Sequence, residues 1–166
     1  MSEKLCEPYA SLLRRLLDVA IERLGSELVS FVVYGSVARC EASRESDIDI
    51  LVVLKNPPRS RLKRQELFMW IEEGVEEEVE KLRSQGYYVD FSPIIKSVNE
   101  AKRVSPLYLD MVEDAVVLYD REDFFTNVLN NLREKLRELG AERVRYGRKW
   151  YWRLKKDYKF GEVIEL

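Results

Sequence analysis

Two apolar runs constrain the fold of this chain most strongly: LVSFVVY at residues 28–34 and DIDILVVL at 47–54. Short runs rich in β-branched residues are typical of buried strands, and a breaker closes each of them, Gly35 after the first and NPP after the second. The second run contains two aspartates, Asp47 and Asp49. Because a buried carboxylate costs free energy unless a positive group pairs with it, these aspartates predict a cation at the start of the strand.

The spacing of the two aspartates places them on the same side of the strand. Side chains alternate along a strand, so Asp47 and Asp49 point to one face while Ile48 and Ile50 point to the other. Residues two apart lie ~6.5 Å from each other at their Cα atoms. Without a cation one carboxylate would tend to hold its proton, whereas Mg²⁺ favours both charged forms and takes oxygen ligands. The pattern therefore predicts a magnesium site.

The loop before the aspartates supplies a complementary feature. Gly35 has no Cβ and would let a polyanion approach the backbone N–H groups. Ser36 is placed to cap a short helix through VARCE, and the N-terminus of a helix favours negative charge. A strand, a glycine-serine turn and a second strand with the pattern DxD together predict a site for a metal-bound nucleoside triphosphate.

The stretch GSVARCEASRESDID, followed by ILVV, resembles the signature of the DNA polymerase β nucleotidyltransferase superfamily, and specifically its minimal nucleotidyltransferases. The resemblance extends over about residues 28–96. It implies that Gly35 and Ser36 hold the triphosphate of ATP or another nucleotide. It also implies that Asp47 and Asp49 bind two magnesium ions, together with a third carboxylate from a nearby strand.

For the third carboxylate we choose Asp90. It lies within the apolar segment YYVDFSPII, where a charged side chain is again costly unless it has a function. In this assignment Asp90 helps to bind the catalytic metal and accepts the proton from the attacking hydroxyl. The alternative is an aspartate on an edge strand that faces solvent. Asp110, Asp114 and Asp120 lie in less favourable sequence contexts.

Polar residues beside the glycine-serine turn are secondary candidates. Arg39 and Arg44 flank the turn and are either contacts of the β- or γ-phosphate or solvated loop residues. Ser46 directly precedes the aspartates and is a candidate to cap or support them.

The absence of histidine narrows the chemistry. None of the 166 residues is histidine, which excludes Ser-His and Cys-His mechanisms and imidazole metal ligands. Proton transfer and metal binding therefore fall to carboxylates. The formal net charge of -2 excludes binding of a polyanion through overall charge, so any affinity for nucleic acid would be local.

The sequence also bears on location and redox state. It contains no apolar run long enough to cross a bilayer, and residues 1–10 lack the pattern of a signal peptide, so we expect a cytoplasmic protein without a membrane partner. Cys6 and Cys40 fit neither a zinc motif nor a disulfide framework, and we expect two reduced thiols without a role. The oligomeric state stays open, a homo-oligomer included.

The remaining patterns complete an α/β (α+β) nucleotidyltransferase fold with a mixed sheet flanked by helices. Residues 1–120 are expected to form the nucleotidyltransferase domain, and 121–166 a C-terminal helix and a basic aromatic tail packed on the same domain. Pro93 places its strand at an edge or marks its exit. The expected helices are 9–24, 60–85, a short one near 105–113 and 124–139, and the further strands are 87–95 and 115–119.

The tail is rich in basic and aromatic residues. In KWYWRL the period is two, so Trp150, Trp152 and Leu154 share one face of a strand. Either these tryptophans cover the core of the domain, or they form a basic aromatic surface for RNA, a nucleotide base or an acidic protein. The basic residues of this segment are Arg143, Arg145, Arg148, Lys149, Arg153, Lys155, Lys156 and Lys159.

These features favour a magnesium-dependent transferase that moves a nucleoside monophosphate to a hydroxyl and releases pyrophosphate. The family resemblance implies AMP from ATP as the transferred group, a tyrosine of a HEPN toxin as acceptor, and hence an antitoxin. One alternative is a transferase for a small molecule of the antibiotic type, although such enzymes usually carry additional helical domains. Another is a non-catalytic module that binds nucleotide or masks a toxin.

Overall fold

The computed structural model describes residues 4–147 and 149–166. Its centre is a mixed four-stranded sheet in the order β3-β2-β1-β4. Strand β1 runs antiparallel to β2 and to β4, and β2 runs parallel to β3, so the expected mixed sheet is confirmed. The strands are β1 (Leu28–Tyr34), β2 (Ile48–Leu54), β3 (Phe91–Ser97) and β4 (Val116–Asp120).

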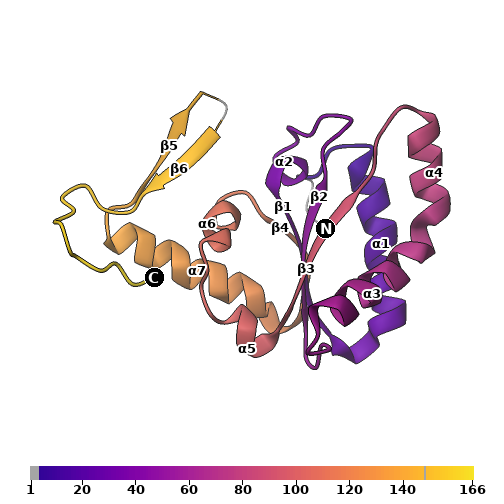
Figure 1. Ribbon diagram of the computed structural model, residues 1–166, viewed down its shortest axis with the longest axis horizontal. Coiled ribbons are helices and arrows are strands. Elements are labelled where there is room, and N and C mark those ends of the chain that lie inside the picture. The colour runs from indigo at the N-terminus through magenta and orange to yellow at the C-terminus, as the bar shows by residue number, and fades with distance from the viewer. Residues whose placement is uncertain (1–3, 148) are drawn as a thin grey trace.

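Helices cover both faces of this sheet (Figure 1). On one face lie α1 (Tyr9–Leu24), α3 (Arg61–Glu72) and α4 (Glu76–Ser84), and on the other α5 (Val98–Ala101), α6 (Leu107–Met111) and α7 (Phe124–Glu138). The short helix α2 (Gly35–Ala38) follows β1 directly. Within residues 4–147 and 149–166, every helix falls short of the length and apolar character needed to span a bilayer.

Strand β2 separates two hydrophobic cores because its side chains alternate between the two faces of the sheet. Ile48 and Ile50 belong to the core under α1 and α3. Leu51 and Val53 belong to the core under α6 and α7. By the same alternation Asp49 lies on the side of α6 and α7, at the end of the strand where that core gives way to solvent.

The single helix expected over 60–85 is interrupted. A 3-10 turn at Glu73–Val75 separates α3 from α4. Gly74 packs so closely on α1 that an added Cβ would lie 2.6 Å from a methyl carbon of Val19. This break depends on a contact between helices distant in sequence, so the apolar period of the segment does not reveal it.

The third strand begins at Phe91, four residues later than expected. Earlier in this segment the backbone bonds to the loop that precedes β2: the Tyr88 N–H donates to the carbonyl oxygen of Arg44 at 2.7 Å. Pro93 lies on β3, which is an edge strand of the sheet, so the edge position predicted for this proline is confirmed.

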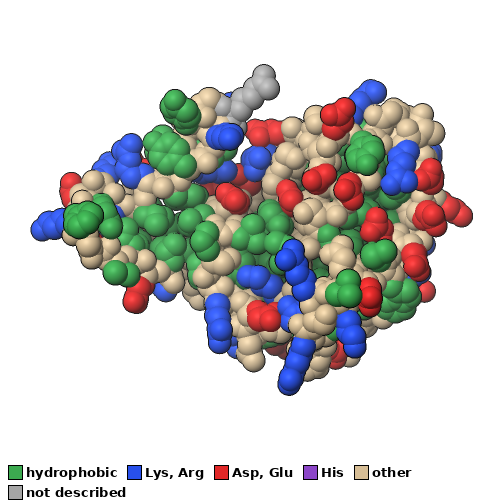
Figure 2. Space-filling view, in the orientation of Figure 1, with side chains coloured by type: hydrophobic (Ala, Val, Ile, Leu, Met, Phe, Trp, Pro, Cys, Tyr) green, Lys and Arg blue, Asp and Glu red, His purple; other side chains and the backbone are tan. Residues whose placement is uncertain are grey.

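The basic aromatic tail forms one strand of a hairpin. Strand β5 (Glu142–Tyr146) pairs antiparallel with β6 (Lys149–Arg153), and the sequence patterns did not indicate β5. The hairpin lies beyond α6 and α7, away from the sheet (Figure 1). Basic and acidic side chains meet in the hollow between it and the rest of the molecule (Figure 2). Arg148 lies outside the described residues.

The two tryptophans of β6 have different environments. Trp152 packs against the core under α7, and its indole N–H donates to the carbonyl oxygen of Leu109 on α6 at 2.9 Å. Trp150 is exposed, with the guanidinium of Arg143 4.7 Å from its ring centroid. Trp152 therefore anchors the hairpin, whereas the ring of Trp150 is accessible.

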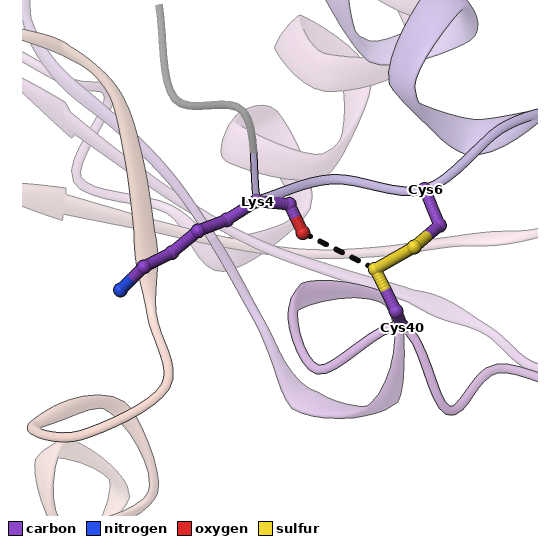
Figure 3. The surroundings of a disulfide bond; sticks show 3 residues. All are labelled: Lys4, Cys6 and Cys40. Carbon is purple, nitrogen blue, oxygen red and sulfur yellow. Dashed lines mark hydrogen bonds between the residues drawn. A yellow bond between two sulfur atoms is a disulfide. The ribbon is translucent and has the colours of Figure 1, made fainter.

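The expectation of two reduced thiols is wrong, because Cys6 and Cys40 form a disulfide (Figure 3). Their Cα atoms lie 5.5 Å apart although 34 positions separate them in sequence. The fold brings the segment before α1 against the turn that follows α2, a proximity that cysteine spacing does not indicate. The carbonyl oxygen of Lys4 lies 3.1 Å from the Cys40 sulfur in the same cluster.

Candidate active site

Gly35 and Asp49 are in direct contact where β1 ends and β2 begins. The antiparallel register pairs Tyr34 with Asp49, and Gly35 follows with a φ of +73°. A Cβ added at Gly35 would lie 2.2 Å from Oδ2 of Asp49. The carboxylate of Asp49 thus occupies the space that any other residue at position 35 would fill, which gives the predicted association of these two residues a structural basis.

The carboxylate of Asp49 is partly buried and lies near other carboxylates, so its charged form is disfavoured. Its side chain is half-buried, whereas Asp47 lies just before β2 and is exposed. Burial raises the pKa of Asp49, and the neighbouring carboxylates of Asp47 and Asp110 raise it further, while Arg39 lowers it. A cation bound between Asp47 and Asp49 would offset both the repulsion and the cost of burial.

A pocket of about 610 Å³ opens beside Asp49, and we call it the Asp49 pocket. It brings together four of the residues selected from the sequence: Gly35, Ser36, Arg39 and Asp49. Its other lining residues come from β1, α6 and the hairpin: Tyr34, Leu107, Asp110, Arg143, Lys149 and Trp150. Carboxylates and cationic side chains therefore line the same pocket, which suits a ligand that carries both a cation and phosphate groups.

The predicted helix cap at Ser36 is wrong. Helix α2 starts one residue earlier, at Gly35, and Tyr34 occupies the capping position without a side-chain hydrogen bond to the helix. Ser36 is therefore the second residue of α2, partly exposed to the pocket. Its carbonyl oxygen accepts the N–H of Glu41 at 2.9 Å, which fixes the turn after the helix.

The structure places Asp90 apart from the Asp49 pocket. Asp90 lies immediately before β3, and its carbonyl oxygen accepts the N–H of Ile48 at 2.9 Å, so its backbone is level with Asp47. Its side chain is exposed, and its charge, after the effect of burial, raises the pKa of Glu72 at the end of α3. Across residues 4–147 and 149–166, no cluster of three or more acidic or cysteine side chains is arranged to hold a metal.

Asp110, which the sequence placed behind Asp90 as a candidate, is the further carboxylate on the lining of the Asp49 pocket. It lies on α6, lines the Asp49 pocket and raises the pKa of both Asp49 and Tyr34. The segment carrying it was correctly expected to be a short helix, but an aspartate on a short helix is common on protein surfaces. The one available signal was its position just before the strand that pairs with β1.

The secondary candidates have separate positions. Arg39 lines the pocket, and its Nε donates to Glu41 at 2.9 Å. Arg44 turns the other way and stacks on Tyr87, with 5.1 Å between its guanidinium and the ring centroid. Ser46 supports the loop before the aspartates, since its hydroxyl accepts the N–H of Ser43 at 2.9 Å.

A glycine turn in contact with a half-buried strand carboxylate, in a pocket that also contains arginine side chains, suits an enzyme that acts on phosphate esters. The chain belongs to the nucleotidyltransferase domain family, whose family model matches residues 13–119. It is accordingly a nucleotidyltransferase. The matched region contains Gly35, Asp49 and Asp110 and ends before the β5–β6 hairpin.

Similar proteins include one from Methanocaldococcus jannaschii whose name assigns it provisionally as a protein adenylyltransferase. It is 28% identical over 141 residues, which cover 84% of this chain and 88% of the relative. A toxin-antitoxin crystal structure with AMP-PNP is 16% identical, covering 76% of this chain and 91% of the other, with a TM-score of 0.46. A structure of a tri-AMPylated Shewanella oneidensis HEPN toxin in complex with an MNT antitoxin is 15% identical. The match covers 79% of this chain and 92% of the other, with a TM-score of 0.41.

Proposed function

We propose that the protein is a magnesium-dependent adenylyltransferase that moves AMP from ATP to a hydroxyl of a protein. The observation that carries the proposal is the contact between Gly35 and Asp49 inside a pocket that also contains Arg39. The name of the Methanocaldococcus jannaschii relative favours a protein acceptor and AMP. The acceptor to test first is a tyrosine of a HEPN protein, as the resemblance to minimal nucleotidyltransferases implies.

The carboxylates of Asp47 and Asp49 suit Mg²⁺, since both supply hard oxygen ligands and their repulsion falls when a cation binds. When bound, Mg²⁺ supplies positive charge that stabilises the phosphates during transfer. Gly35 leaves the backbone of the turn open to the phosphates. Arg39 lines the same pocket and is suited to pair with phosphate oxygens.

The transfer step needs one proton acceptor. The acceptor oxygen forms a bond to the α-phosphorus, the bond from this phosphorus to the bridging oxygen breaks, and the electron pair leaves with pyrophosphate. The hydroxyl proton passes to a carboxylate, and we propose Asp90 for this role, as the sequence pattern suggests. Asp110 is the second candidate, because it lines the same pocket as Asp49.

The first test is transfer of label from α-³²P ATP, with Mg²⁺, to a co-expressed HEPN protein or a lysate. Asp49→Asn should lower transfer by at least about 100-fold, the loss typical of removing one preorganised electrostatic group. In metal-free buffer the same variant should be as stable as wild type or more so, because a buried like charge is removed.

Asp18→Asn is the matched control, since Asp18 is exposed on α1 and the same substitution there should leave transfer unchanged. ATP binding without transfer of label to any acceptor would contradict the proposal and favour a non-catalytic module. Comparing Asp90→Asn with Asp110→Asn then identifies the proton acceptor, as the variant whose transfer rate recovers most when the pH is raised, because the acceptor hydroxyl then loses its proton without help from a carboxylate.

A further inference from the structure

The β5–β6 hairpin contributes to the Asp49 pocket although it lies outside the region matched by the nucleotidyltransferase family. The family match ends at residue 119, whereas Arg143, Lys149 and Trp150 line the pocket together with Gly35 and Asp49. The hairpin is held in place by the bond from Trp152 to α6 and by an ion pair of Arg143. The pocket is therefore shared between the family region and an element that the family pattern does not describe.

One carboxylate joins the two sides of this pocket. Oδ2 of Asp114 accepts a hydrogen bond from Arg143 at 2.5 Å and lies 3.8 Å from a guanidinium nitrogen of Arg39. The side chains of Asp114 and Arg143 are each 19% exposed, and that of Arg39 is 26% exposed. Asp114 thus contacts two arginines from segments distant in sequence, and Glu41 also holds Arg39, at 2.9 Å.

The pocket lining carries three cationic side chains, Arg39, Arg143 and Lys149. Glu41 pairs with Arg39 at 2.9 Å and Asp114 pairs with Arg143, while Lys149 adds a further positive charge. Arg143 is also fixed from the other side by the ring of Trp150. Its bond to Asp114 raises the pKa of the guanidinium, which keeps it charged. The cluster therefore places fixed cationic side chains on the lining of the pocket that contains Asp49.

We propose that Arg143 and Arg39, oriented by Asp114, bind the terminal phosphates of the nucleoside triphosphate, so that the hairpin completes the nucleotide site. The inference rests on the proposed function, because the reacting phosphate has to lie near Asp47 and Asp49. The remaining phosphates then need positive charge elsewhere in the same pocket, and a guanidinium pairs with two phosphate oxygens at once. Arg143 is a binding residue in this arrangement and Asp114 a positioning residue.

The test measures the dissociation constants of AMP, ADP and ATP by calorimetry in the presence of Mg²⁺. Wild type should bind ATP more tightly than AMP. Arg143→Gln should raise the dissociation constant of ATP about tenfold or more, the usual effect of losing a hydrogen-bonded charge, while that of AMP stays within about twofold. A purely structural role of Arg143 would weaken the binding of both nucleotides alike.

Two further variants separate the guanidinium from net charge and from folding. Arg145→Gln removes the same charge from the same strand. Arg145 lies 5.5 Å from the ring centroid of Trp150 but does not itself line the pocket, so the preference for ATP should persist. The double variant Arg143→Gln with Asp114→Asn keeps the net charge and leaves no unpaired carboxylate behind. It should lose the preference for ATP as the single variant does.

The outcomes distinguish this inference from the proposed function. If Arg143→Gln and the double variant keep the wild-type ratio of ATP to AMP affinity, the inference is overturned while the transferase proposal stands. If nucleotide affinities are unchanged and only the KM of a protein acceptor rises, the hairpin binds the acceptor and the inference is again overturned. A wild-type protein that neither binds ATP nor transfers label overturns both proposals.

Discussion

Gly35 has a positive φ and lies in close contact with Asp49. Experiments can separate the effect of the backbone conformation from the effect of the contact. At a φ of +73° any other residue is strained, and at Gly35 an added methyl group would also displace the carboxylate of Asp49. Gly35→Ala should therefore lose about 1–2 kcal/mol of stability from the backbone and also lose transfer activity by about 100-fold, because a catalytic group is misplaced. Urea unfolding and transfer of label measure the two effects.

Gly140 provides the matched control for this substitution. Its φ of +68° imposes the same backbone strain, but an added Cβ there would have nothing within 4 Å. Gly140→Ala should lose a similar amount of stability and keep the activity of wild type. If both alanine variants remained fully active, the contact between Gly35 and Asp49 would have no part in the chemistry.

The sequence allowed prediction of those site residues that stand out from their immediate neighbours in the chain. Gly35 and Asp49 could be found because each is an exception within an apolar run, and the structure places them in contact. The position of Asp110 and Arg143 in the same pocket as Asp49 could not be predicted, because it depends on the packing of α6 and of the hairpin. An ordinary surface aspartate or arginine has the same local sequence context.

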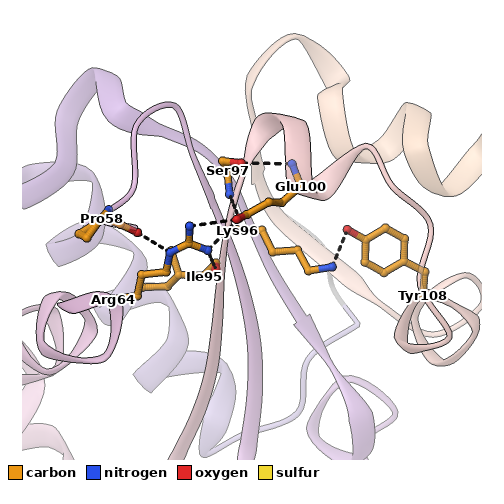
Figure 4. A network of polar contacts seen from close by, with 7 residues as sticks. All are labelled: Pro58, Arg64, Ile95, Lys96, Ser97, Glu100 and Tyr108. Carbon is orange, nitrogen blue, oxygen red and sulfur yellow. Dashed lines mark hydrogen bonds and ion pairs between the residues drawn. The ribbon is translucent and has the colours of Figure 1, made fainter. Parts of the chain in front are cut away.

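Among the elements, α3 is tied to the segment after β3 by a polar network around Arg64 (Figure 4). Its guanidinium donates to the carbonyl oxygens of Pro58 and Ile95 and to the carboxylate of Glu100. Glu100 also completes a capping box with Ser97 at the start of α5. The hydrogen bond from Arg64 is the largest cause that lowers the pKa of Glu100, to about 2.

This network predicts a pH-dependent contribution to stability. Because the pKa of Glu100 is lower in the folded protein than its ordinary value of 4.5, the contribution is present above about pH 4.5 and is lost as the pH falls towards 2. Glu100→Gln should therefore unfold at a lower urea concentration than wild type at pH 7, and the difference should disappear towards pH 2. Urea titrations across this pH range check the prediction.

Glu80→Gln is the comparison, because Glu80 pairs with Arg83 on the exposed surface of α4. Its effect on stability at pH 7 should stay within about 0.5 kcal/mol, as is usual for exposed pairs. A Glu100→Gln variant with the same stability as wild type at pH 7 would show that the network around Arg64 adds nothing to the fold.

Most elements could be predicted because each has its own apolar period or run. Strands β1 and β2 and helices α1 and α7 coincide with such patterns. The break at Gly74 and the strand β5 could not be predicted, since the first depends on Val19 and the second on pairing with β6. In both cases a tertiary contact decides the local structure.

Over the whole molecule, the disulfide between Cys6 and Cys40 closes a loop across α1 and β1. A bond that joins residues 34 positions apart restricts the unfolded chain and contributes roughly 3 to 4 kcal/mol in the chain-entropy treatment. Dithiothreitol should therefore lower the urea midpoint of wild type. The Cys6→Ser, Cys40→Ser double variant should start at the lower midpoint and show no response to the reductant. A wild-type midpoint that is indifferent to dithiothreitol would exclude a stabilising role for this bond.

The alternation along β2 has a consequence for how the whole sheet assembles. A slip of one residue in the pairing of β2 with β1 would turn Asp49 into the core under α1 and α3 and would bring Ile48 or Ile50 to the pocket. Burying that carboxylate among apolar side chains would cost several kcal/mol, so the mispaired sheet is disfavoured from the start of folding. Asp49 therefore also helps to fix the register of β2, and a variant with an apolar residue at this position should misfold more readily than wild type.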